Sequence, residues 1–476
     1  MKQLLGEVIA VADGIAWVSF PKLTNGHVVL FENKVQGLVM SVGERSCVLI
    51  LGDPTSIRSG MSVTTTNTPL SVPVGDALLG RVINPLGVPL DGEPLETDET
   101  LPVERPALSI AKREPVNEPL STGVLAVDAM IPIGRGQREL LIGDRGTGKT
   151  TLAIDTIINQ KKTNVLAVYV AIGQKRSDVA SLIERLIEED ALSRTVVVAA
   201  DASTPAAFWY IAPFAGATIA ESLRESGRDV VIIYDDLTKH AWSYREISLL
   251  MGRPAGREAY PGDVFYLHSR LLERANKRAK EFGGGSITAL PIIETQAGDV
   301  GSYIPTNVIS ITDGQVYFET DLFFKGIRPA VNPGLSVSRV GGTAQTKAIK
   351  KLSGKLRLTL SQYWELTGFS QFGGGGDKTI AKKLLEGERL LEALKQNQGA
   401  PYNHEQEVAL LYLVQSGFLQ EIDLSEVKAA MKSYISRVVS NEKLAHLIEE
   451  KQELTPEVVA GLDEALVTLK KQFVNS

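Results

Sequence analysis

The segment that decides the fold is Gly143-Asp144-Arg145-Gly146-Thr147-Gly148-Lys149-Thr150, which matches the pattern G-x-x-x-x-G-K-[ST] without a gap. An apolar run precedes it, and a helical pattern that begins at Thr151 follows it. Glycines let backbone N–H groups converge on phosphate oxygens, and the N-terminus of the following helix adds partial positive charge. In such a loop Lys149 reaches the β and γ phosphates, and Thr150 offers its hydroxyl to Mg²⁺. Residues 143–151 therefore predict a binding site for ATP or ADP with Mg²⁺.

A second segment supports this prediction. The apolar run 230–234 has the character of a buried strand, and it ends in Asp235 and Asp236. An acid at the end of such a strand can hold the water shell of Mg²⁺. Asp235 is the predicted metal-site residue, acting through water, because it directly follows the run; Asp236 is expected to be a local hydrogen-bonding partner.

The middle of the chain alternates strand and helix patterns. Continuous apolar runs stand at 139–142, 165–172, 195–199, 230–234 and 287–293. Helical patterns lie between several of them, for example at 179–188 and 208–226. Strands that are buried on both faces read this way when helices cover both sides of a parallel sheet. The middle of the chain is therefore predicted to be an α/β domain.

The two ends of the chain follow different patterns. Short apolar and β-branched runs stand at 8–11, 15–20, 27–31, 37–42 and 46–51, separated by Gly, Asn, Asp and Pro, and they predict a small closed barrel over the first 68 residues. From about residue 346 apolar residues recur at helical spacing, as in the segments 427–438 and 458–469. With 476 residues the chain has room for about three domains. We predict a multidomain α/β protein with a barrel over 1–68, a nucleotide-binding domain over 69–345 and a helical domain over 346–476.

Composition narrows the classes of function. The net charge of −6 argues against broad coating of nucleic acid. Cys47 is the single cysteine, so no internal disulfide can form, and the five histidines show no metal-site spacing. No apolar stretch approaches the roughly 20 residues of a membrane span. We expect a soluble protein that meets a membrane only through partners.

Four further segments, at 132–140, 170–177, 256–263 and 336–341, carry a resemblance to a known family. With them the chain closely resembles the alpha subunits of F-type ATP synthases over nearly its whole length. The resemblance implies a β-barrel crown, a RecA-like nucleotide domain and a helical bundle. It also implies a ring that alternates with beta subunits around a gamma shaft, a peripheral stalk with a delta subunit, and a place on the cytoplasmic face of a prokaryotic cell membrane, which is contacted only through the ion-translocating sector.

Two residues acquire roles from this resemblance. Catalytic beta-type subunits have a glutamate where this chain has Gln174, and an amide cannot activate water as a carboxylate does. The implied site is therefore non-catalytic and regulatory. Arg339, in Ser-Val-Ser-Arg, matches the arginine that reaches the catalytic site of the neighbouring beta subunit. Such an arginine finger is typically worth about 10³–10⁵ in rate.

The resemblance also implies contacts to the adenine end of the nucleotide. Arg328 and Pro329 match the family's base-contacting pair, and Gln396 and Gln398 match two glutamines near the base. The two amides would hydrogen-bond to the purine edge. From the residues alone, the favoured interpretation of Gln396 and Gln398 is a polar helix end.

The chain departs from the family pattern in three places. Gly146 stands where the family usually has glutamine, so backbone contacts to phosphate persist while the loop gains freedom and nucleotide retention is expected to weaken. The first residues start almost at the barrel, which predicts altered docking of the peripheral stalk. The segment 371–377 is glycine-rich where the family has an acidic turn. These departures favour a divergent branch, with H⁺ and Na⁺ both open as the coupling ion.

Two other classes share this core. A catalytic hexameric ATPase of protein export or secretion would need a glutamate at the position of Gln174. A ring-shaped ATPase that depends on nucleic acid would need basic and aromatic residues together on its barrel, and residues 1–68 offer few basic ones beside Trp17, Phe20 and Phe31. The alpha-subunit interpretation requires neither feature.

Overall fold

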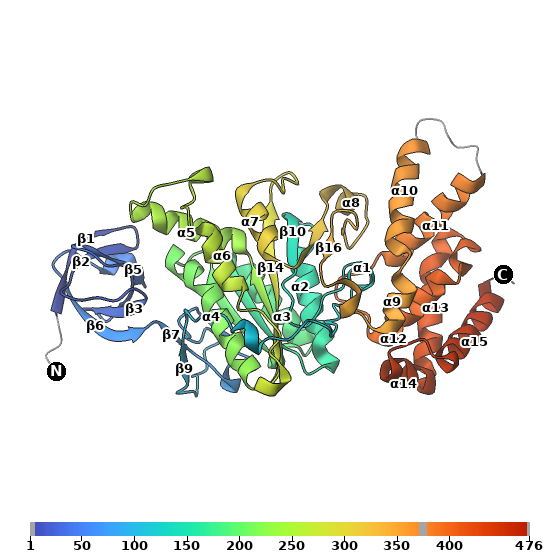
Figure 1. Ribbon diagram of the computed structural model, residues 1–476, viewed down its shortest axis with the longest axis horizontal. Helices are drawn as coiled ribbons and strands as arrows, with labels where there is room; N and C mark the ends of the chain where they lie inside the picture. The colour runs from blue at the N-terminus through green and yellow to red at the C-terminus, as the bar shows by residue number, and fades with distance from the viewer. Residues whose placement is uncertain (1–4, 371–377, 474–476) are drawn as a thin grey trace. The chain divides into compact units, whose positions relative to one another are not determined.

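The computed structural model describes residues 5–370 and 378–473. The chain divides into two compact units, which we describe one at a time. The first contains residues 1–114, 164–294 and 299–312, and the second contains 115–163, 295–298 and 313–476. Figure 1 labels helices and strands of both where there is room.

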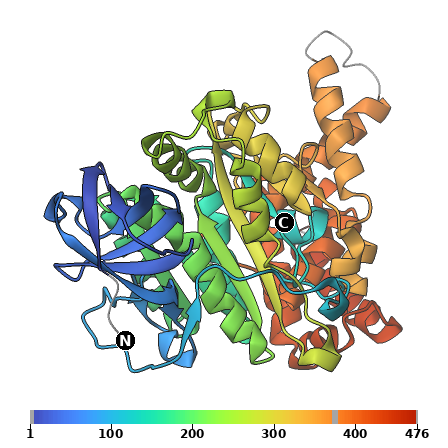
Figure 2. The same cartoon turned by 60° about the vertical axis from the view of Figure 1, so that its left-hand side comes forward.

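The first unit begins with a closed barrel, which appears in blue in Figure 2. Six antiparallel strands form it in the order β1-β2-β5-β4-β3-β6. Their bounds are Leu5–Ala12, Ile15–Ser19, His27–Phe31, Gln36–Ser41, Ser46–Leu51 and Ser62–Pro69 for β1 to β6. The barrel interior is filled by alternating apolar side chains such as Val18, Val29 and Val48. The predicted barrel is confirmed, and β6, with its run of threonines, is a strand that the apolar pattern did not indicate.

Parallel strands follow in the first unit, in the order β14-β13-β11-β12-β8. Their bounds are Val82–Ile83 (β8), Leu166–Gln174 (β11), Thr195–Asp201 (β12), Asp229–Asp235 (β13) and Ser286–Thr295 (β14). Strands β11 and β13 are neighbours, with Ala171 opposite Asp235. The carboxyl ends of these two strands therefore meet at one edge of the sheet.

Helices pack against these strands, and α4 and α5 both contact β11. The helices of this unit are Arg176–Glu188 (α3), Ala206–Glu225 (α4), Leu237–Leu250 (α5), Val264–Leu272 (α6) and Tyr303–Ile311 (α7). A two-stranded piece, β7 (Ser71–Pro73) with β9 (Thr100–Pro102), lies in the segment after the barrel. The predicted α/β pattern with a parallel sheet is confirmed.

The second unit contains the glycine-rich loop. Strand β10 (Leu140–Asp144) pairs in parallel with β15 (Gly314–Phe318), which pairs antiparallel with β16 (Val337–Ser338). The short helices α1 (Leu125–Met130) and α8 (Thr320–Phe324) flank these strands in sequence, and α2 (Lys149–Asn159) follows the loop. The sequence order strand, loop, helix is the one that the motif predicts.

The rest of the second unit is helical, as predicted. The helices are Lys347–Ser353 (α9), Leu356–Ser370 (α10), Lys378–Leu394 (α11), His404–Gln415 (α12), Val427–Ser440 (α13), Glu442–Lys451 (α14) and Pro456–Phe473 (α15). Helices α10 and α11 run side by side (Figure 1). The faces of α13 and α15 that the periodicity marked as apolar are buried. None of the helices that the structure describes has the length and apolar character to cross a bilayer.

The domain limits 1–68, 69–345 and 346–476 remain predictions. The glycine-rich segment 371–377 lies outside the described residues.

Candidate functional site

The loop between β10 and α2 owes its shape to glycine. At Gly143 an added Cβ would lie 2.4 Å from the carbonyl oxygen of Phe318 on β15, so no larger residue fits. Gly148 has a φ of 106° and is the residue from which α2 starts, a conformation that L-residues with side chains rarely adopt. The loop thereby presents its backbone at the N-terminus of a helix, which is where anions bind most readily.

Lys149 is the first residue of α2 and folds back over the loop. Its ammonium group donates to the carbonyl oxygens of Gly143, at 2.7 Å, and of Asp144, at 2.6 Å. Thr147 also closes on the loop, with its hydroxyl donating to the Asp144 carbonyl at 2.8 Å. The residues 143–151 predicted as a phosphate site thus form one continuous turn, in which Arg145 and Gly146 are exposed and Thr150 and Thr151 are half-buried.

The Asp144 carboxylate organises the segments around this turn. It accepts hydrogen bonds from the Thr295 hydroxyl at 2.6 Å, from the Gly298 N–H at 2.9 Å and from the Thr320 hydroxyl at 3.0 Å. Burial by itself would raise the pKa of Asp144, but these bonds and the charge of Lys149 lower it. Asp144 therefore acts as an ionised acceptor that ties two segments, 295–298 and the start of α8, to the loop.

In the first unit, Gln174 and Asp235 lie together at the ends of β11 and β13. The Gln174 amide donates to Asp235 Oδ1 at 2.8 Å and to the Asp235 carbonyl oxygen at 3.2 Å. The Tyr169 hydroxyl, which is buried, donates to Asp235 Oδ2 at 2.6 Å. Each carboxylate oxygen of Asp235 therefore accepts a hydrogen bond from a neutral donor.

Tyr169 is a site residue that sequence reasoning missed. Burial and the adjacent Asp235 carboxylate raise the pKa of its phenol, so it stays a neutral donor. One signal was available, because a tyrosine inside a continuous apolar strand must find a partner for its hydroxyl. The sequence could not tell which acid on a neighbouring strand that partner would be.

Asp236 has the local role predicted for it. It is the N-cap of α5, and its Oδ1 accepts from the backbone N–H of Lys239 at 2.8 Å. The Lys239 ammonium lies 2.8 Å from Oδ2. Complete burial raises the pKa of Asp236 to about 6, although the lysine acts in the opposite direction.

The four residues predicted at the adenine end lie in two segments of the second unit that meet. The backbone N–H of Gln396 donates to the carbonyl oxygen of Arg328 at 2.8 Å. The Arg328 guanidinium lies over the ring of Phe323, 4.3 Å from its centroid. Gln398 is exposed and Pro329 is half-buried. The structure thus brings both pairs together at the surface of this unit.

The Gln396 side chain is engaged with the backbone. Its Oε1 accepts from the N–H of Leu125 at 3.1 Å, and its Nε2 donates to the carbonyl oxygens of Gly123, at 2.7 Å, and Ala400, at 2.8 Å. The neighbouring Gly399 N–H donates to Asp155 on α2. In this structure Gln396 therefore fastens its segment to the chain around α1, and contact with a base remains a prediction for it.

Two acidic residues, Asp128 and Glu407, lie in the same region. Asp128 on α1 accepts from Ser121, Thr122 and Gly123 at 2.7–3.0 Å. Glu407 on α12 is fully buried, and neither of its carboxyl oxygens has a donor among the described residues. Burial first, and then the charge of Asp128, raise the pKa of Glu407 well above its usual range. A protonated Glu407 can donate to Asp128, and this is the arrangement that satisfies both groups.

Arg339 directly follows β16. Its backbone N–H donates to the carbonyl oxygen of Asp313 at 2.8 Å. Its side chain is exposed and makes no hydrogen bond or ion pair with the part of the chain that the structure describes. An unpaired guanidinium on a fixed backbone is available to another molecule.

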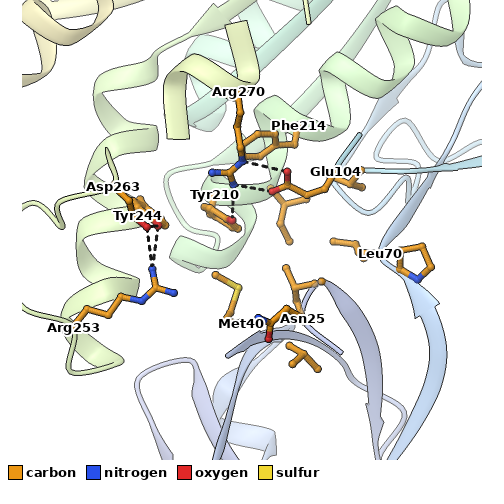
Figure 3. A pocket seen from close by; sticks show the side chains of 16 residues that line it. Asn25, Met40, Leu70, Glu104, Tyr210, Phe214, Tyr244, Arg253, Asp263 and Arg270 are labelled. Atoms are coloured by element: carbon orange, nitrogen blue, oxygen red, sulfur yellow. Dashed lines mark hydrogen bonds and ion pairs between the residues drawn. The ribbon is translucent and has the colours of Figure 1, made fainter. Parts of the chain in front are cut away.

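A pocket of about 370 Å³ lies elsewhere in the first unit (Figure 3). Tyr210 and Tyr244 stack in its wall, and its two arginines are already paired, Arg270 with Glu104 and Arg253 with the Tyr244 hydroxyl and Asp263. None of the predicted site residues lines this pocket. It is therefore separate from the nucleotide chemistry that the loop predicts.

The glycine-rich loop between a strand and a helix, with a parallel strand that ends in Asp235, defines the class of P-loop nucleotide-binding proteins. Family models agree and are more specific. Residues 123–338 match the ATP synthase alpha/beta family, nucleotide-binding domain, and residues 345–469 match the ATP synthase alpha/beta chain, C terminal domain.

Curated relatives match almost end to end. The ATP synthase subunit alpha of Caldanaerobacter subterraneus subsp. tengcongensis is 51% identical over 475 residues, which cover 99% of this chain and 94% of the relative. That of Acetivibrio thermocellus is 52% identical, with 99% and 94% covered, and that of Macrococcus caseolyticus is 53% identical, with 94% and 90% covered. The chain belongs to the ATP synthase alpha/beta family, and the predicted resemblance to alpha subunits is confirmed.

Proposed function

We propose that this chain is the nucleotide-binding alpha subunit in the head of a rotary ATP synthase, with a regulatory site of its own that does not hydrolyse ATP. The chain would also supply Arg339 to the catalytic site of an adjacent beta subunit. The observation that carries the proposal is the amide of Gln174 bonded to Asp235 at 2.8 Å.

Hydrolysis needs a group that can orient and polarise the attacking water. Gln174 has no useful basicity, and its NH₂ group is directed at Asp235. Asp235 in turn accepts hydrogen bonds from Gln174 and from Tyr169, which fix the position of its carboxyl oxygens at the end of β13. The hydrogen-bonded group of Gln174, Asp235 and Tyr169 therefore contains no base that could activate water.

The predicted site residues are chemically suited to a nucleotide bound with Mg²⁺. The loop offers backbone N–H groups and the Lys149 ammonium to phosphate oxygens, and Thr150 and Asp235 offer the hard oxygen ligands that Mg²⁺ prefers. Arg328, Pro329 and Gln398 would meet the base, while Gln396 holds their surroundings together through Gly123 and Leu125. The bound metal would neutralise phosphate charge, and this chain would supply the positions of its ligands.

Arg339 would act outside this chain. Its exposed guanidinium suits the charge that develops on a γ-phosphate held by a beta subunit, where a fixed cation stabilises the transition state. The proposed partners are therefore beta subunits in an alternating ring, a gamma shaft, and a peripheral stalk with a delta subunit. The proposed location is the cytoplasmic face of a prokaryotic membrane, reached through the ion-translocating sector.

The experiment uses the purified full-length chain without beta. Binding of ATP is measured by calorimetry with Mg²⁺, and phosphate release is followed on the same sample. We expect one saturable nucleotide site per chain and negligible turnover. Turnover at an ordinary rate of about 1–100 s⁻¹ would overturn the non-catalytic assignment, and failure to bind ATP would overturn the site itself.

A further inference from the structure

A buried acid stands beside the strand that carries Arg339. Glu139 immediately precedes β10, and its side chain is fully buried. Its Oε2 accepts a 2.6 Å hydrogen bond from the amide of Gln137. Its Oε1 has no hydrogen-bond partner among the described residues. An incompletely paired buried carboxyl group costs stability, so its presence indicates a role.

Gln137 connects this acid to β16. Its Oε1 accepts from the N–H of Gly134 at 2.8 Å, and its Nε2 donates both to Glu139 and, at 3.3 Å, to the Ser338 hydroxyl. The Ser338 hydroxyl donates in turn to the carbonyl oxygen of Pro132 at 2.6 Å. Glu139 and Gly134 therefore fix which way the Gln137 amide faces, and Gln137 together with Pro132 fixes Ser338.

Arg339 is the next residue along the chain. Its backbone is held from the other side by the bond from its N–H to the Asp313 carbonyl oxygen, at 2.8 Å. Asp313 is itself fixed by an ion pair with Arg138 at 3.0 Å. The residue is thus clamped at its own N–H and at the preceding side chain, while its exposed guanidinium group interacts with Glu139 through charge alone.

Gly314 shows how closely the Glu139 carboxyl group packs against the strands beside Arg339. Gly314 pairs with Ser338 across β15 and β16, and it has a φ of 148°. A Cβ at this position would lie 2.6 Å and 2.9 Å from the two carboxyl oxygens of Glu139. A Cβ would lie still closer to the carbonyl oxygen of Val337, so glycine is required here by the backbone of β16 and by the Glu139 carboxyl group together, and β15 packs closely against both.

We propose that Glu139 is a positioning residue for Arg339, acting through Gln137 and Ser338 to set the direction in which the arginine leaves β16. The inference rests on the proposed function, in which Arg339 serves a neighbouring catalytic site. A displacement of about 1 Å in such a group can cost 10²-fold in rate, so the support matters although Glu139 touches no substrate.

The test is a double-mutant cycle on rings reconstituted from this chain, beta and gamma, with assembly checked by size and steady-state ATPase measured. Glu139→Ala should lower kcat about 10- to 100-fold with KM nearly unchanged, and Glu139→Gln, which keeps an acceptor for Gln137, should retain much more of the rate. In an Arg339→Ala background Glu139→Ala should have little further effect, because its action passes through the arginine. Glu442→Ala, which removes an exposed glutamate of α14, is the control for unspecific effects of mutation and reconstitution.

The outcomes separate the two claims. If Arg339→Ala alone leaves turnover near wild type, the proposed function fails and this inference falls with it. If Arg339→Ala is severe but Glu139→Ala is silent, or costs the same factor in both backgrounds, only the positioning role is overturned. Should Glu139→Ala not assemble, Ser338→Ala cuts the same connection and should show the same dependence on Arg339; an additive or absent effect there contradicts the proposal.

Discussion

The Gln174 amide donates a 2.8 Å hydrogen bond to the carboxylate of Asp235 at the ends of two adjacent parallel strands. The same carboxylate accepts from Tyr169. Two neutral side chains therefore donate to the carboxyl group of Asp235. A carboxylate in place of Gln174 would face Asp235 at hydrogen-bond distance, and two such groups cannot both ionise without a large cost.

Gln174→Glu should therefore destabilise this chain, although it supplies the carboxyl group that the site lacks. The two carboxyl groups would share a proton, so the pKa of the pair would rise. A raised folded-state pKa means that stability is lost as pH increases, so the variant should be weakest at high pH. Thermal unfolding at pH 5 and pH 8 checks this.

Gln174→Ala is the matched control, because it removes the donor without adding charge. It should cost about 1–3 kcal/mol at both pH values. If Gln174→Glu is as stable as the native chain at pH 8, the interpretation of this pair is wrong.

Lys149→Ala should weaken binding of Mg-ATP to the isolated chain by about 10- to 100-fold, since charge-assisted contacts contribute about 1.5–3 kcal/mol. An assembled ring with this variant should keep part of its activity, because the affected site is regulatory. Calorimetric titration gives the affinity, and Lys382→Ala, at an exposed position of α11, is the control. Equal affinities for all three chains would show that the loop does not engage phosphate.

Glu407→Gln should change how stability depends on pH. Burial and Asp128 raise the pKa of Glu407, so the native state holds a proton that the unfolded state releases. The contribution of this proton to the free energy of unfolding is fully present at pH values below the usual pKa of glutamic acid. It is lost as the pH rises through the raised pKa of the native state. Glutamine can donate to Asp128 at any pH, so its advantage should grow with pH, by about 1.4 kcal/mol for each tenfold difference in proton affinity between the folded and unfolded states.

Calorimetric unfolding at pH 5 and pH 8 measures this difference. A constant difference between the native chain and Glu407→Gln would mean that Glu407 is charged throughout. Glu442→Gln, at an exposed position, should show no such dependence on pH.

Local patterns were sufficient for most of the fold. Apolar runs identified five strands of the barrel and the strands β10 to β14. Strands that are buried on one face have alternating apolar residues, and strands that are buried on both faces have continuous apolar runs, so both kinds can be found from the sequence. Strand β6 was missed because its threonines carry no apolar pattern. The phosphate loop could be predicted from the sequence because its backbone geometry requires glycine, as the close approach of Gly143 to Phe318 shows.

The supporting contacts of the site could not be predicted from the sequence. Gln396 bonds to Leu125 across 271 residues, and Tyr169 meets Asp235 across 66. Such pairs depend on strand order and helix docking, which a single sequence does not specify. The burial of Glu407 is similar, because an acid in a helix is ordinarily expected to face water.

The role of Arg339 is the central claim, and one measurement tests it most directly. Rings are assembled from beta, gamma and this chain carrying Arg339→Ala, their size is confirmed, and multisite ATPase is measured beside the native ring. The account predicts a fall of about 10³-fold or more with nucleotide affinity at the beta sites little changed, because the guanidinium acts on charge that develops in the transition state. A fully assembled ring that turns over ATP at close to the native rate would contradict it.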